Sequence, residues 1–147
     1  MVDTVQVNYL YPPDMLSGGW DEKSGNRRVT VRLAGSSDGT GETDVHKIVL
    51  TDLKTTNKNV PTRTAIEWIE WQGLGMGITL EWDRAPNALI ARLNQNGVES
   101  GGRLDWSNVG GLVDPGLDDR TGDIMLSSSS PDAGDTYDIT MCIRLKD

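Results

Sequence analysis

The stretch YDITMCIRL, residues 137–145, decides the fold class of this chain. Every second residue in it is apolar: Tyr137, Ile139, Met141, Ile143 and Leu145. Because successive side chains of a β-strand point to opposite faces of the sheet, this period of two predicts a strand with one buried face. A helix would instead scatter these residues around its axis. The same test can be applied outward from this strand to the rest of the chain.

Similar alternation, or a short apolar run between turn residues, occurs at seven other places. These predicted strands cover residues 5–9, 27–33, 45–50, 66–71, 78–82, 88–93 and 124–126, of which 88–93 also fits a short helix. The segments 35–41, 73–77 and 127–134 have the composition of turns, and the chain has 17 glycines. Eight or nine short strands predict an all-β fold: an antiparallel, jelly-roll-like β-sandwich, with a barrel as the alternative. We expect one domain over residues 1–147, because no repeat or long linker interrupts the chain.

The apolar positions of these strands define the expected core. The chain contains no Phe, so tryptophans must supply the large aromatic volume of the interior. Trp82 alternates in phase with Ile78 and Leu80, which places it inside. The residues expected between the two sheets are Val29, Val31, Leu80, Trp82, Ile124, Ile139, Met141 and Ile143.

The composition excludes several classes of function. Fourteen basic residues face 22 acidic ones, and this net charge of −8 opposes nonspecific binding of nucleic acid. No apolar run reaches the roughly 18 residues of a membrane span, and the first residues lack the pattern of a signal peptide. One cysteine allows no intrachain disulfide, which suits a reducing compartment. We therefore expect a protein made in the cytoplasm, with no nucleic-acid or membrane partner.

Neither the one histidine nor the one cysteine indicates catalysis. His46 sits in a strand pattern, opposite the face of Val45, where an exposed side chain is expected. Cys142 falls on the polar side of the strand at 137–145, two residues from Arg144, and is interpreted as a passive thiol. A zinc site usually takes at least three protein ligands, several of them His or Cys, which one His and one Cys cannot supply. We expect no catalytic residue, cofactor or metal, and hence no enzyme.

Two acidic loops raise calcium as a second possibility. Residues 114–123 contain Asp114, Asp118, Asp119 and Asp123, but their spacing is not that of an EF-hand and no closing Glu follows. The same reasoning applies to Asp38, Glu42 and Asp44. Asp and Gly are also ordinary turn residues, so turn chemistry is the favoured interpretation of both loops.

Tryptophans beside carboxylates leave a sugar-binding function open. Trp68, Trp71 and Trp82 each follow a glutamate. A carbohydrate-binding module would place two or more indoles coplanar on one exposed surface. Alternation instead sends Trp68 and Trp71 to opposite faces of their strand, and Trp82 to the core.

The first residues form a separate apolar stripe. Val5, Val7, Tyr9 and Tyr11 alternate with polar residues until Pro12 and Pro13 end the pattern. Residues 1–14 can be an ordinary first strand of the domain or an arm that reaches a neighbouring chain by strand addition. The four apolar residues of the stripe are therefore the candidate partner contacts.

Several segments together resemble a known family. They are VQVNYLYPP (5–13), RRVTVRL (27–33), SDGTGETD (37–44), LEWD (80–83), GGLVDP (110–115), TGDI (121–124) and GDTYDIT (134–140). In these turn and strand signatures the chain resembles the head-decoration, or auxiliary capsid, proteins of tailed bacteriophages. The resemblance covers most of the chain and involves no chemical motif.

The resemblance implies a β-sandwich that binds the outside of an assembled capsid, as a homotrimer on the lattice of the major capsid protein. It also implies a location on the virion surface and no catalytic residues. Two alternatives remain at this point: a carbohydrate-binding β-sandwich module, and another virion component of the tail or neck.

Overall fold

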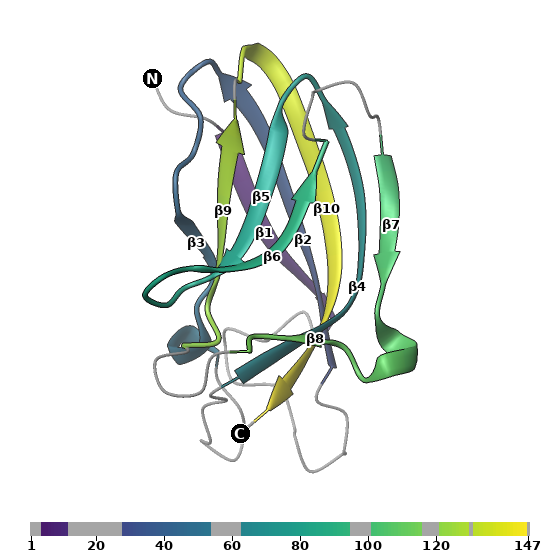
Figure 1. Ribbon diagram of the computed structural model, residues 1–147. Coiled ribbons are helices and arrows are strands. Elements are labelled where there is room, and N and C mark those ends of the chain that lie inside the picture. Colours follow the sequence, from purple (N-terminus) through teal and green to yellow (C-terminus); the bar gives the residue numbers. More distant parts are fainter. Residues whose placement is uncertain are drawn as a thin grey trace.

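The fold is all-β, as the sequence predicts. A computed structural model describes residues 4–11, 28–53, 63–94, 101–115, 121–129 and 131–146. These residues form ten strands and two short 3₁₀ helices, η2 (Leu50–Asp52) and η3 (Ser107–Val109), and no α-helix. The strands make two antiparallel sheets in a β-sandwich-like arrangement (Figure 1). Within these residues, no helix has the length and hydropathy of a membrane span.

The two sheets differ in size. The larger has the order β1-β2-β10-β4-β7, and β8 also pairs with β4. Its strands are β1 (Thr4–Tyr11), β2 (Arg28–Asp38), β10 (Ala133–Lys146), β4 (Arg63–Leu74), β7 (Gly101–Asp105) and β8 (Leu112–Val113). The smaller sheet has the order β3-β9-β5-β6, formed by β3 (Val45–Ile48), β9 (Ile124–Ser129), β5 (Gly77–Trp82) and β6 (Ala88–Leu93). The jelly-roll connectivity stays a prediction.

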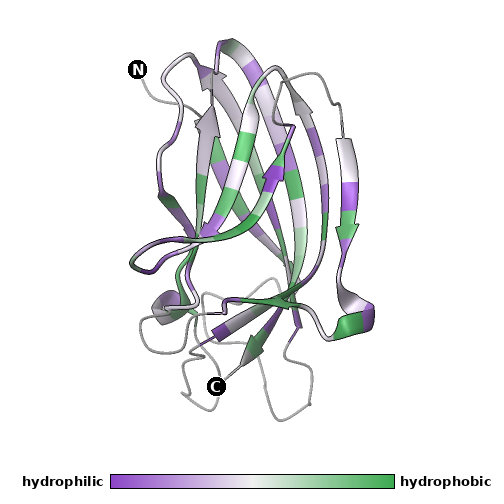
Figure 2. Ribbon diagram, in the orientation of Figure 1, coloured by the Kyte–Doolittle hydropathy of each residue, from purple (hydrophilic) through white to green (hydrophobic). Residues whose placement is uncertain are grey.

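The core lies between the inner faces of the two sheets. The five alternating apolar residues of β10 are each at most 4% exposed. They belong to one hydrophobic cluster with residues of β2, β4, β5, β6 and β9, and Figure 2 shows the corresponding alternation of hydropathy along the strands. All eight residues predicted for the core are buried: Val29, Val31, Leu80, Trp82, Ile124, Ile139, Met141 and Ile143. Period two therefore identified the buried faces correctly.

Sheet pairing extends some strands beyond their apolar pattern. The predicted loops 35–41 and 127–134 are partly wrong, since β2 runs to Asp38, β9 runs to Ser129 and β10 begins at Ala133. The ambiguous segment 88–93 is a strand. β7 and β8 were not predicted, because they are short and β7 begins with two glycines; both form by pairing along β4. The stop at Pro12 and Pro13 lies outside the described residues.

A β-bulge in β4 determines which way its tryptophans face. The register with β10 shifts at Glu67, which has no partner in the ladder. Beyond the bulge, Trp71 pairs with the buried Ile139 and belongs to the core, at 9% exposure. Trp68 lies on the opposite, outer face, as alternation predicted.

Two sets of polar contacts connect the layers. Lys47 Nζ lies 2.5 Å from Glu42 Oε1, and the Tyr137 hydroxyl donates to Glu42 Oε2 at 2.7 Å, all three residues being buried. At another point the Trp82 indole N–H donates to Thr64 Oγ1, which in turn donates to the carbonyl of Gly122, at 3.0 Å each. Buried polar groups cost little only when they are bonded in this way.

Replacing Ile139 by Asp should unfold the domain. The side chain is 1% exposed, so Ile139→Asp places an unpaired charge among apolar neighbours. The cost is comparable with the whole stability of a domain, about 5–15 kcal/mol. The neighbouring variant Thr140→Asp is the control, because Thr140 faces outward and lies between Arg32 on one strand and Glu70 on the other. Thermal melts monitored by circular dichroism should show no transition for the first variant and a near-normal one for the second; equal melts would contradict the register of β10.

Candidate functional site

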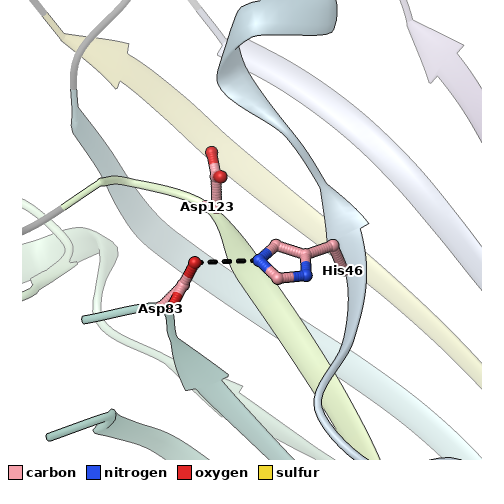
Figure 3. Close-up of side chains that lie close together, drawn as sticks. All are labelled: His46, Asp83 and Asp123. Carbon is pink, nitrogen blue, oxygen red and sulfur yellow. Dashed lines mark hydrogen bonds and ion pairs between the residues drawn. The ribbon is translucent and has the colours of Figure 1, made fainter. Parts of the chain in front are cut away.

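The chain's one histidine lies in a cluster with two aspartates. His46 Nε2 is 2.9 Å from Asp83 Oδ2, and Asp123 completes a set whose ligand atoms lie within 4.8 Å of one another. The three side chains lie close together at one end of the smaller sheet, with Asp83 directed at His46 (Figure 3). His46 is exposed, whereas Asp83 and Asp123 are half-buried. One imidazole nitrogen and two carboxylates are a donor set that divalent metal ions use.

Strand pairing brings these residues together from three separate segments. β9 lies between β3 and β5, with Met125 beside His46 and Ile124 beside Trp82. Asp83 follows β5 and Asp123 precedes β9, so the two become neighbours across the ladder. The Asp83 N–H donates to the carbonyl of Asp123 at 3.1 Å. The cluster is therefore built on the ends of paired strands.

Additional hydrogen bonds fix the two aspartates. The Thr121 hydroxyl donates to the carbonyl of Asp83 at 2.8 Å. Asp123 Oδ1 accepts the backbone N–H of Leu50 at 2.9 Å. Burial raises the pKa of Asp123, and the nearby carboxylates of Asp83 and Asp52 act in the same direction, against the lowering effects of the Leu50 N–H and His46. The ionised form of Asp123 is therefore less favourable in the folded chain than in water.

The sequence predicted an exposed His46, which is confirmed, but not its partners. Of the four aspartates weighed as calcium ligands, Asp114 pairs with Arg84 at 2.9 Å, Asp118 and Asp119 lie outside the described residues, and Asp123 joins His46. In the other acidic loop, Glu42 pairs with Lys47. Asp38 accepts the N–H of Thr40, and Asp44 contacts Ser127, as turn residues do.

The outer face of the larger sheet carries paired charges and an open groove. Arg32 contacts Asp138 through two hydrogen bonds of 2.9 and 2.5 Å. Arg103 bonds to Glu70 and Asp105, and its guanidinium lies 4.8 Å from the centroid of the Trp68 ring. A groove of about 810 Å³ runs between these groups, lined by Leu10, Arg32, Gln72, Arg103, Asp138 and Thr140, among others.

The described tryptophans do not share one exposed surface. Trp71 and Trp82 are in the core, Trp106 packs against it, and only Trp68 lies on the outer face of β4. Trp20 lies outside the described residues. The arrangement therefore lacks, in the part of the chain that is described, the paired indoles expected of a sugar-binding platform.

β1 divides its apolar stripe between the core and the surface. Val7 and Tyr9 pack against the core, and burial, with a smaller effect of Asp52, raises the pKa of Tyr9 to about 12. Val5 and Tyr11 remain 40% and 55% exposed. Leu10, which the sequence interpretation did not single out, is 49% exposed beside them and lines the groove. β1 pairs with β2, so it is a strand of the domain's own sheet.

Cys142 is buried on the outer side of β10 beneath an ion-paired glutamate. Its Sγ lies 3.7 Å from Glu67 Oε2, and Glu67 pairs with Arg28 at 2.8 Å and Arg144 at 3.1 Å. Burial raises the pKa of the Cys142 thiol and the Glu67 carboxylate raises it further, while Arg28 partly opposes both. The electrostatics fit the passive thiol predicted from the sequence.

Comparisons with known protein families, with curated proteins and with solved structures each found no match for this chain.

The Cys142 thiol should react slowly and only at high pH. Because its pKa is raised, the thiolate forms at higher pH than in the unfolded chain, and the rate with a thiol reagent should rise later with pH. Glu67→Gln removes the raising carboxylate and leaves Arg28 and Arg144 nearby, so it should accelerate the reaction severalfold. Glu70→Gln, on the same strand but paired with Arg103, is the matched control. A fast wild-type reaction at neutral pH would contradict the assignment.

Proposed function

We propose that this protein is a non-enzymatic structural component of a phage virion that binds the outer surface of the assembled capsid and stabilises the shell. The turn and strand segments that resemble head-decoration proteins support the proposal, and so does a sandwich with two sheets of the expected kind. The acidic composition, with a net charge of −8, favours an exterior position over one facing the genome.

The observation that carries the proposal is the surface around β1. Among the described residues β1 pairs only with β2, and it stands at the edge of the larger sheet. An edge strand offers backbone N–H and C=O groups to a neighbouring chain. Val5, Leu10 and Tyr11 add exposed apolar area at the same edge. An apolar edge strand of this kind is suited to docking against a protein lattice.

Multivalency supplies the preference for an assembled shell. A symmetric oligomer that touches several lattice subunits at once gains effective concentration, and avidity exceeds single-site affinity by about 10²–10⁴-fold. A homotrimer matches three-fold positions of a capsid, which is why we propose that state. Because the protein binds the assembled state, mass action then stabilises the shell.

Sedimentation with capsids tests the role. Purified protein should co-sediment with expanded capsids of the parent phage and scarcely bind unassembled capsid subunits. Leu10→Asp should lower capsid binding by about tenfold or more, because it places a charge in the interface. Leu89→Asp is the matched control, since Leu89 on β6 of the other sheet is 44% exposed, close to the 49% of Leu10.

Two results would count against the proposal. Equal binding to capsids and to free subunits, or no binding to capsids, contradicts the decoration role and leaves the tail, neck and carbohydrate alternatives. Equal loss of binding in both leucine variants contradicts the assignment of the contact to β1.

A further inference from the structure

We propose that His46, Asp83 and Asp123 bind one divalent transition-metal ion, for which Zn²⁺ is the best match. This site is independent of the capsid role. It also departs from the metal-free domain expected from the sequence, where His46 had no visible partners. Three separate segments bring these three side chains close to one another (Figure 3).

The donor set selects the class of metal. Ca²⁺ and Mg²⁺ take oxygen ligands, whereas an imidazole nitrogen suits Zn²⁺ and other first-row transition metals. Three protein ligands and an exposed position next to His46 leave room for water to complete a four-coordinate zinc site. The chemistry therefore favours a site that contains the histidine over an all-oxygen site.

The separations of the ligand atoms suit a common ion. Ligand bonds to zinc are about 2.0–2.2 Å, which places neighbouring donors about 3–4 Å apart. His46 Nε2 and Asp83 Oδ2 are 2.9 Å apart, and the whole set lies within 4.8 Å. Binding of all three donors to one ion requires the longest of these separations to shorten to that range, and we attribute this change to rotation of the side chains.

The surroundings orient the ligands before an ion arrives. Asp123 Oδ1 accepts the N–H of Leu50 at 2.9 Å, which fixes the orientation of the carboxylate. The backbone of Asp83 is held at its N–H by Asp123 and at its carbonyl by Thr121. A hydrogen bond to a ligating carboxylate, such as that from Leu50 to Asp123, orients the ligand in metal sites, and loss of such a contact typically weakens binding about 10–100-fold.

The charge at this point also favours a cation. Asp83 and Asp52 are both close enough to act electrostatically on Asp123, and His46 is the basic group of the cluster. An ordinary surface ion pair needs one carboxylate for one imidazole. The second, half-buried carboxylate gains a partner when a divalent ion is bound.

Titration calorimetry and NMR with Zn²⁺ alone test the site. Untagged full-length protein, treated with chelator and then dialysed, should bind one Zn²⁺ per chain. The chain has one histidine, so its imidazole signals need no further assignment, and Zn²⁺ should shift them. His46→Gln and Asp123→Asn should each weaken binding at least about tenfold. Asp138→Asn, which removes the same charge on the outer face of the larger sheet, should bind like the wild type.

Melting temperatures measured without metal separate loss of binding from loss of structure. Without metal, Asp123→Asn should melt at or above the wild-type temperature, because it removes a half-buried charge beside Asp83 and retains an oxygen for the Leu50 N–H. The proposal is overturned if Zn²⁺ produces neither heat nor an imidazole shift at millimolar concentration, or if His46→Gln binds as tightly as the wild type. Several weak ions per chain, insensitive to these substitutions, would also overturn it.

Discussion

The inward row of β10 is the constraint on which the rest of the sandwich depends. Its apolar side chains fill the space between the sheets, and each fully buried one contributes about 1.5–3 kcal/mol. β10 also sets the register of β2 on one side and β4 on the other. β1 is placed by β2, and β7 and β8 by β4, so the edges of the larger sheet depend on the same central strand. A slip of one residue would turn the whole row outward.

Two buried charged residues, Lys47 and Glu67, lie where a β-bulge interrupts this pattern. The bulge in β3 leaves Lys47 outside the ladder, and its ammonium reaches Glu42 between the layers. The bulge in β4 does the same for Glu67, which meets two arginines on the outer side. For the buried Lys47–Glu42 pair, removal of one partner typically costs about 3–5 kcal/mol, because a charge is left without compensation. The arginines that pair with Glu67 are more exposed, so water screens that cluster and its loss costs less. In both places the strands continue their pairing on either side of the bulge, so the charged residue is accommodated without loss of the ladder.

Alternation in the sequence located most of the strands and the predicted core residues, including the opposite orientations of Trp68 and Trp71. It was insufficient where pairing rather than pattern makes a strand, as in β7 with its two glycines. The cluster around His46 could not be predicted from local alternation for a related reason. Asp83 and Asp123 are far apart in the chain and lie side by side because β9 pairs with β5. His46 joins them because β9 also pairs with β3. Local patterns predict which face of a strand is buried, whereas strand order is a property of the whole fold.

The exposed apolar residues of the edge strand β1 form the surface that we propose binds the capsid. Electron cryo-microscopy of the parent virion tests this account most directly. The account predicts density for the two-sheet sandwich on the outer surface of the head, at three-fold positions, with Leu10 and Tyr11 of β1 against the capsid protein. Density for the domain in the tail or neck, or on the head with β1 facing solvent, would contradict it.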